Sequence, residues 1–142
     1  MTTTKTMDIK LERTIPAPAA EVFDAWLDPN TPVNPFSGAK KLIFDLKKDA
    51  LFNFVHHHDG KDLAHYGRFD VIERPTKVQY TWMSPYTRGL ESLVTVTFTT
   101  KGEDTLVSLT HANLPDDDYG RAHDGGWKGY LKKLGDKFSP GA

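Results

Sequence analysis

Residues 116–138 read DDDYGRAHDGGWKGYLKKLGDKF, and the rest of the chain is best understood outward from them. Trp127, Leu131, Leu134 and Phe138 follow one another at intervals of four, three and four residues, which draws one apolar stripe along a helix. The carboxylates at its start and the lysines toward its end suit the helix dipole. Because such a helix needs an apolar surface to lie on, we expect a sheet curved around it and a functional site between the two.

The first strand and a short helix are predicted before the main part of the sheet. Residues 9–15 alternate between apolar and polar side chains, and only Arg13 interrupts the apolar face. Pro16–Pro18 ends this strand and leads into a short helix that carries Phe23 and Trp26 on one side. Residues 30–38 are expected to form a loop or a second short helix.

A meander of strands follows, over residues 40–47, 51–58 and 63–73, and then a strand that carries Val78, Tyr80 and Trp82. The dipeptide Asp59-Gly60 is a strong signal for a two-residue hairpin turn. This turn would place Phe54 opposite His65 and His56 opposite Leu63. Leu42, Phe44 and Leu46 are in register along the first strand of the meander. The side chains of the next two strands that are then expected to share the inward face are Phe52, Phe54, His56, Leu63, His65, Phe69 and Val71.

A second hairpin is predicted from residues 90–100, the turn Lys101–Asp104 and the strand after it. The turn would pair Phe98 with Val107, Val96 with Leu109 and Val94 with His111. His111 is therefore expected at the inner end of an otherwise apolar strand face.

The expected fold class is α+β, with about seven antiparallel strands, and the whole of residues 1–142 is expected to form one domain with 1–7 flexible. The chain contains no cysteine, which excludes disulfides, thiolate catalysis and cysteine metal sites. Its formal net charge of -1, without a basic cluster, argues against nucleic acid as a partner. No signal peptide or membrane span is evident, so we expect a cytoplasmic protein without membrane insertion.

The order of these elements resembles the helix-grip fold of the SRPBCC superfamily, which includes START lipid-transfer domains, pollen-allergen-like proteins and polyketide cyclases. The greatest similarity is to the activator-of-heat-shock-protein-90-ATPase-like family. The segments that carry it are Arg13–Phe23, Asp28-Pro29, Gly67–Pro75, Tyr80–Trp82, Val94–Phe98, Leu109–His111 and Gly126-Trp127 with Leu131 and Leu134. Two positions depart from the family pattern, because Phe36 stands for a tryptophan and Lys48–Ala50 for a glycine pair. Both lie near the mouth of the family's cavity, so no relative's ligand is carried over.

The resemblance implies a hydrophobic ligand, and the inward aromatic residues favour a pocket on the order of several hundred cubic ångströms between the last helix and the sheet. The residues that we expect to contact the ligand are Arg13, Phe54, His56, His65, Phe69, Tyr80, Trp82, Val94, His111, Trp127 and Leu131.

The polar candidates each allow two interpretations. His56, His58 and His65 share a hairpin face and could bind a transition metal, or they could simply be solvated. We expect no metal and no cofactor. His111 and Arg13 could be tied to polar groups at the edge of the core, or they could orient the polar end of a ligand.

Two alternative functions remain beside ligand binding or transport. The same cavity could serve a cyclase or dehydratase with His111 or His65 as general acid or base, although no residue is assigned as catalytic. The family resemblance also suggests a co-chaperone-like contact with a heat-shock ATPase, in a stress response. Motifs for nucleophilic hydrolysis, phosphoryl transfer or dinucleotide binding do not occur in the sequence.

Overall fold

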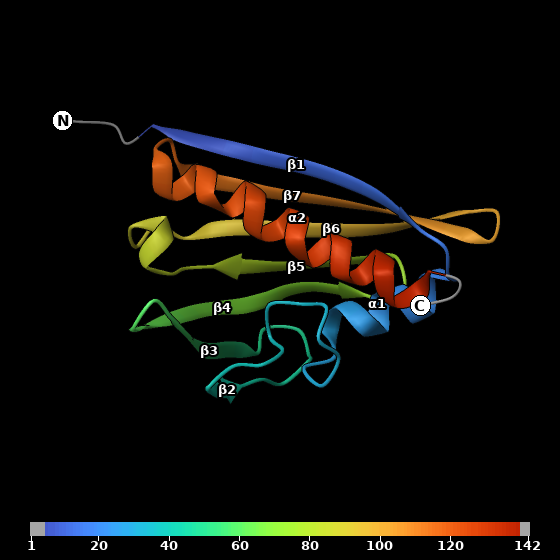
Figure 1. Cartoon of the computed structure of the whole chain (residues 1–142), viewed down its shortest axis with the longest axis horizontal. Helices are drawn as coiled ribbons and strands as arrows, with labels where there is room; N and C mark the ends of the chain where they lie inside the picture. The colour runs from blue at the N-terminus through green and yellow to red at the C-terminus, as the bar shows by residue number, and fades with distance from the viewer. Residues whose placement is uncertain (1–4, 140–142) are drawn as a thin grey trace.

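The computed structural model describes residues 5–139, except for the side chain of His58. The elements in chain order are β1 (Thr6–Ile15), α1 (Ala19–Leu27), β2 (Lys41–Ile43), β3 (Leu51–His58), β4 (Lys61–Glu73), β5 (Lys77–Trp82), the 3-10 helix η1 (Pro85–Thr87), β6 (Ser92–Lys101), β7 (Asp104–Pro115) and α2 (Asp118–Phe138). The seven strands form one antiparallel sheet in the order β1-β7-β6-β5-β4-β3-β2. Helix α2 runs diagonally across one face of this sheet, and α1 lies near its C-terminal end (Figure 1). The predicted α+β class is confirmed.

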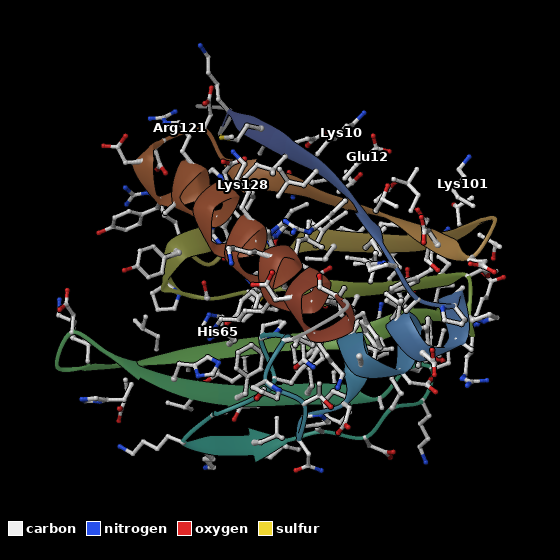
Figure 2. All side chains as sticks on the ribbon, turned by 45° about the vertical axis from the view of Figure 1, so that its right-hand side comes forward. Lys10, Glu12, His65, Lys101, Arg121 and Lys128 are labelled. Atoms are coloured by element: carbon white, nitrogen blue, oxygen red, sulfur yellow. The ribbon has the colours of Figure 1, made fainter. Side chains whose placement is uncertain are left out.

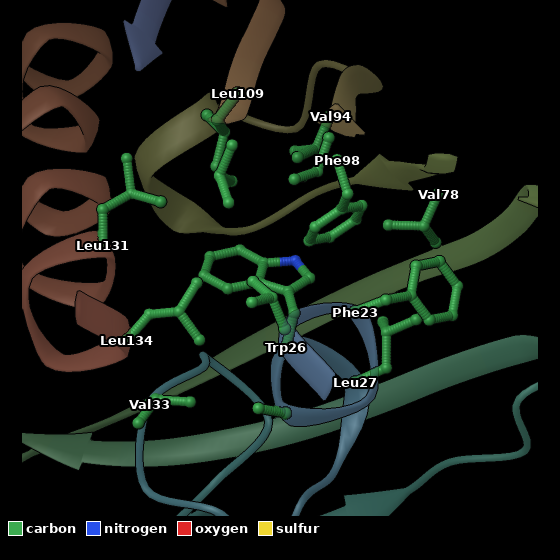
Figure 3. Close-up of a cluster of buried hydrophobic side chains, with 14 of the residues drawn as sticks. Phe23, Trp26, Leu27, Val33, Val78, Val94, Phe98, Leu109, Leu131 and Leu134 are labelled. Atoms are coloured by element: carbon green, nitrogen blue, oxygen red, sulfur yellow. The ribbon is translucent and has the colours of Figure 1, made fainter. Parts of the chain in front are cut away.

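Helix α2 begins and packs as its sequence predicts. The Asp117 carboxylate caps it by accepting hydrogen bonds from the backbone N–H groups of Tyr119 and Gly120 at 2.9 and 3.1 Å. Leu131 and Leu134 point from the helix toward the indole of Trp26 (Figure 3). Trp127 is buried in the same core. The apolar stripe is therefore the surface by which α2 is attached to the sheet.

Both predicted hairpin registers are confirmed. Phe54 pairs with His65 across β3 and β4, and Val94 pairs with His111 across β6 and β7. Asp59 and Gly60 both have positive φ, at 54° and 75°, as a two-residue hairpin turn requires.

The strand predicted over residues 40–47 is wrong beyond Ile43, where β2 ends. Leu42 and Leu46 are 37% and 39% exposed, and of the three alternating residues only Phe44 packs against the core. The chain must leave this sheet edge to reach β4, where the backbone N–H of Asp49 donates to the Phe69 carbonyl at 2.7 Å. Tertiary pairing thus overrides the local alternation of apolar residues.

A second correction concerns Val71, which was predicted to face inward. A bulge at Asp70 inserts one extra residue between the pairs Phe69–Tyr80 and Val71–Gln79. The shift moves Ile72 onto the core instead. Asp70 is not left unpaired, because Gln79 Nε2 donates to its carboxylate at 3.0 Å.

Residues 30–38 form a loop of turns, without a second helix. The buried amide of Asn34 holds this loop against α1 by donating to the carbonyls of Ala25 and Asp28, both at 2.8 Å. Phe36 is thereby inserted into the core, where its ring packs against those of Phe44, Phe52, Phe54, Phe69 and Tyr80.

The expected flexible segment 1–7 overlaps strand β1. Strand β1 begins at Thr6, so Thr6 and Met7 belong to the sheet. Residues 1–4 lie outside the described residues.

Candidate functional site

A cleft of about 480 Å³ lies between the first half of α2 and the part of the sheet formed by β3, β4 and the end of β5. Its walls consist of Pro35, Phe54, His56, His57, Leu63, His65, Trp82, Ser84, Tyr86, Ala122, His123, Gly126, Trp127 and Tyr130. None of these side chains is that of lysine, arginine, aspartate or glutamate. The cleft is thus an aromatic and histidine-rich space beside the core.

Some residues predicted to contact a ligand lie together in this cleft and others do not. Those in its walls are Phe54, His56, His65, Trp82 and Trp127. Those outside it are Arg13, Phe69, Tyr80, Val94, His111 and Leu131. Phe69, Tyr80 and Val94 are fully buried in the core, and Leu131 is buried on the side of α2 that faces the sheet. Arg13 is exposed and lies against Gly135, where a Cβ atom would stand only 2.5 Å from the guanidinium.

His111 lies behind the cleft and holds one of its walls. The indole N–H of Trp127 donates to His111 Nδ1 at 2.9 Å, and His111 Nε2 lies 2.7 Å from Ser92 Oγ. The Ser92 hydroxyl donates to the Trp82 carbonyl at 2.6 Å, so its oxygen must accept the hydrogen of His111 Nε2. This chain of bonds fixes the tautomer of His111 and the orientation of Trp127. Burial, with a smaller effect of His123, holds the pKa of His111 well below its usual value, so the ring is neutral.

Replacing Ser92 with alanine is expected to lower the free energy of unfolding by about 1–3 kcal/mol, because it leaves the buried Nε2–H of His111 without an acceptor. Urea unfolding measures this loss. Ser108→Ala serves as the matched control, since its hydroxyl donates to Glu12 at the surface of the neighbouring strand. Equal losses in the two variants would contradict the role assigned to the buried chain.

His65 is the most perturbed titratable group in the cleft walls. Its ring stacks on Phe54 with centroids 4.5 Å apart and an angle of 3°, and it lies 5.2 Å from the ring of Trp82. Burial, with a contribution from nearby His56, lowers the pKa of His65 to about 4. This imidazole is therefore neutral near pH 7. Figure 2 shows His65 on the strands of the hairpin.

His56 and His123 also have defined hydrogen-bond partners. His56 Nε2 lies 2.7 Å from the carbonyl oxygen of Pro35. His123 Nδ1 lies 3.1 Å from the carbonyl oxygens of both Tyr119 and Gly120. Burial lowers the pKa of His123, and the two carbonyl bonds oppose that shift.

The cleft also adjoins an unsatisfied donor. Trp82 is 5% exposed, and its Nε1 has no hydrogen-bond partner among the described residues. Buried N–H groups are normally hydrogen-bonded. This one can donate to a ligand or, after a small movement of the wall, to another group of the protein.

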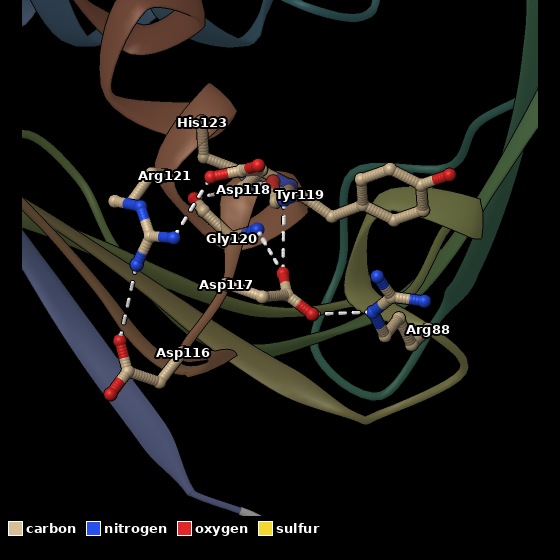
Figure 4. Close-up of polar contacts among 8 residues, drawn as sticks. All are labelled: Arg88, Asp116, Asp117, Asp118, Tyr119, Gly120, Arg121 and His123. Carbon is tan, nitrogen blue, oxygen red and sulfur yellow. Dashed lines mark hydrogen bonds and ion pairs between the residues drawn. The ribbon is translucent and has the colours of Figure 1, made fainter.

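Polar contacts join Arg88, which follows η1, to the start of α2 beside the cleft (Figure 4). Arg88 Nε donates to the Asp117 carboxylate, and the guanidinium lies 4.2 Å from the centre of the Tyr119 ring. Tyr86 packs edge-on against Tyr119 at 5.3 Å. Arg121 pairs with the two neighbouring carboxylates, Asp116 and Asp118. The acidic residues therefore serve capping and ion pairing. Tyr86 is held at the cleft by its packing on Tyr119.

Several wall residues were not predicted from the sequence as ligand contacts. They are Pro35, His57, Ser84, Tyr86, Ala122, His123, Gly126 and Tyr130, together with Leu63, which was expected on the inward face. His123 and Tyr130 could have been found, because they lie four residues before and three after Trp127, on the same helix face. Ser84 and Tyr86 had no such signal, because their position depends on η1, whose capping box is closed by Ser84 and Thr87.

Two of the hairpin histidines have separate polar partners. His57 Nδ1 lies 2.8 Å from the Asp62 carboxylate, whereas His56 is bound to the Pro35 carbonyl. Among the side chains that the structure describes, which do not include that of His58, no three His, Asp or Glu residues come together as a metal site. Likewise, none of the helices within residues 5–139 is long and apolar enough to cross a membrane.

Comparison with known proteins identifies relatives of this fold. The family model described as "Activator of Hsp90 ATPase homolog 1-like protein" matches residues 16–138. The protein Mll3558 from Rhizobium loti superposes with a TM-score of 0.80 and 19% identity, over 96% of this chain and 99% of its own. The protein CV1439 from Chromobacterium violaceum has a TM-score of 0.76 and 22% identity, over 94% and 97% of the two chains.

CalU16 from Micromonospora echinospora is similar too, with a TM-score of 0.71 and 25% identity, over 95% of this chain and 78% of its own. Among curated proteins, none matches.

Proposed function

The chain belongs to the family of activator of Hsp90 ATPase homolog 1-like proteins, and on this premise we propose that it binds a small, mainly hydrophobic molecule in the cleft between α2 and the sheet. Folds of this family typically bind hydrophobic ligands. The proposal rests above all on one observation, the concave aromatic wall beside α2. Its volume of about 480 Å³ is within the range of small-molecule sites.

The character of the wall supports reversible binding. Phe54, Trp82, Trp127 and Tyr130 offer flat apolar surfaces, while histidine and tyrosine groups can orient a polar substituent. A ligand of this kind would gain affinity chiefly from the apolar area that it buries.

The positions of the histidines speak against acid–base catalysis through His111. Both of its ring nitrogens are bound within the protein, to Trp127 and Ser92, so a proton exchange with a ligand would break the chain of bonds that holds the wall. His65 has a pKa of about 4, which makes it a weak base near pH 7. Binding without turnover is the function that we favour.

Gly126 offers a direct test, because it lines the cleft and a Cβ atom added to it would meet nothing within 4 Å. A tryptophan at this position can enter the cleft without displacing the backbone. Gly126→Trp is expected to weaken binding of the uncharged fluorescent probe N-phenyl-1-naphthylamine at least tenfold, by occupying the space that the probe requires. Fluorescence titration measures the dissociation constant.

Gly125→Trp is the matched control. Gly125 has equally open surroundings on the same helix but does not line the cleft. This variant should bind the probe as the unmodified protein does, and thermal unfolding should show that both variants are folded. Unchanged binding by a folded Gly126→Trp variant would refute the proposal. Native mass spectrometry of freshly purified protein would then identify any retained ligand by its mass.

A further inference from the structure

Within the proposed binding function, we infer that the cleft selects an uncharged, planar molecule that carries hydroxyl or N–H hydrogens, of the class of phenols and hydroxylated aromatics. The inference depends on which nitrogen atoms of the wall histidines carry hydrogen. Since neutral imidazole has one donor and one acceptor nitrogen, a known partner of one nitrogen determines what the other can accept or donate.

His56 provides the first acceptor. Its Nε2 lies 2.7 Å from the Pro35 carbonyl oxygen, which can only accept a hydrogen bond. Nε2 therefore carries a hydrogen, and a ring with a single hydrogen keeps a free lone pair on Nδ1. No hydrogen bond to this Nδ1 is formed by the described residues.

His123 provides the second acceptor from the opposite wall. Its Nδ1 donates toward the Tyr119 and Gly120 carbonyls, so the lone pair is on Nε2. The nearest aromatic ring behind it is that of His111, at 5.0 Å, and both nitrogens of His111 are already bound. Within the described residues, Nε2 of His123 therefore has no hydrogen to accept, and a ligand hydroxyl can supply one.

The wall contains no lysine, arginine, aspartate or glutamate side chain, which makes it unfavourable for ionic ligands. A carboxylate or phosphate would find no lysine or arginine among the wall side chains, and a cation would find no carboxylate. The charged groups nearby are committed elsewhere: Asp62 pairs with Lys40 and His57, and Asp124 pairs with Lys128. Transfer of an ion from water into this cleft would thus be uncompensated.

The framework that carries the hydroxyl groups should be flat. The rings of Trp82 and Trp127 meet at 5.1 Å with an angle of 56°, and Phe54 is stacked with His65 on the hairpin side. Aromatic walls favour planar partners by offset or edge-on contacts. The expected ligand is therefore aromatic, with its hydroxyl groups directed at His56 and His123.

Four compounds that share the naphthalene ring test the expected preference for hydroxylated aromatics: 2-naphthol, 2-methoxynaphthalene, naphthalene and 2-naphthoate. Each competes with N-phenyl-1-naphthylamine at pH 7.5. We expect 2-naphthol to displace the probe at a concentration at least tenfold below that of the methyl ether, because only the naphthol donates a hydrogen bond. Naphthoate should be the weakest of the substituted compounds, because its charge has no partner.

Two variants link the preference to one nitrogen. His123→Phe should reduce the advantage of 2-naphthol over its ether to less than threefold while naphthalene binds as before. His123→Gln should restore part of the advantage, since its amide oxygen can accept. Equal binding of naphthol and ether, or tighter binding of naphthoate, would overturn the inference but leave the proposed function intact. If neither the probe nor any naphthalene bound, both would be wrong.

Discussion

Replacing Leu131 with alanine is expected to lower the free energy of unfolding by about 2–5 kcal/mol. Leu131 is 3% exposed and belongs to the stripe by which α2 is held on the sheet. Truncation removes buried methyl groups and leaves a cavity that a close-packed neighbour such as Trp26 can fill only in part. Urea unfolding, followed by far-ultraviolet circular dichroism, measures the change.

Leu51→Ala is the control with the same chemistry. Leu51 is 71% exposed on β3, so its truncation should change stability by no more than about 0.5 kcal/mol. Losses of similar size in the two variants would mean that α2 is not attached to the sheet through Leu131.

The pairing of strands could be predicted from the sequence where the type of turn determines which residues lie opposite each other. A two-residue turn at Asp59-Gly60 allows only one pairing of the strands on either side, and the period of two then assigns each side chain to a face. The same reasoning placed Val94 opposite His111. It failed at Val71, because a bulge at Asp70 reverses the faces, and no residue pattern announces that bulge.

The candidate site was only partly predictable for a related reason. Register placed His111 on the inward face, but it could not reveal that Ser92 and Trp127 would occupy both of its nitrogens. That outcome depends on how three elements meet. Conversely, Phe36 was treated as a departure near the cavity mouth, and its place at the centre of the aromatic core follows from the loop that Asn34 holds.

Acidification from pH 7.5 to pH 4.5 is expected to destabilise the protein by several kcal/mol, chiefly through histidines that are buried in the neutral form. In the unfolded chain a histidine has a pKa near 6.5, whereas burial lowers the pKa of His65 to about 4 in the folded protein. Between these values the unfolded state binds a proton that the folded state does not, so stability falls as the pH falls. His65 alone accounts for about 3 kcal/mol over the full window, and the lowered pKa values of His111 and His123 act in the same direction.

The carboxylates titrate in a separate window, which makes the histidine effect measurable. Hydrogen bonds from Arg74 and from Lys132 hold the pKa values of Asp24 and Asp136 below their usual 3.8. Their stabilising contributions are present above that value and are lost only as the pH falls below it. The free energy of unfolding, measured with urea at pH 7.5, 6, 5 and 4.5, therefore reports mainly on the histidines.

His65→Phe, which keeps a ring against Phe54, should flatten the dependence by up to one proton. If His65→Phe lost stability as steeply as the unmodified protein, His65 would have to take up its proton in the folded state, and the cleft wall would be far more accessible to water than its packing against Phe54 and Trp82 implies.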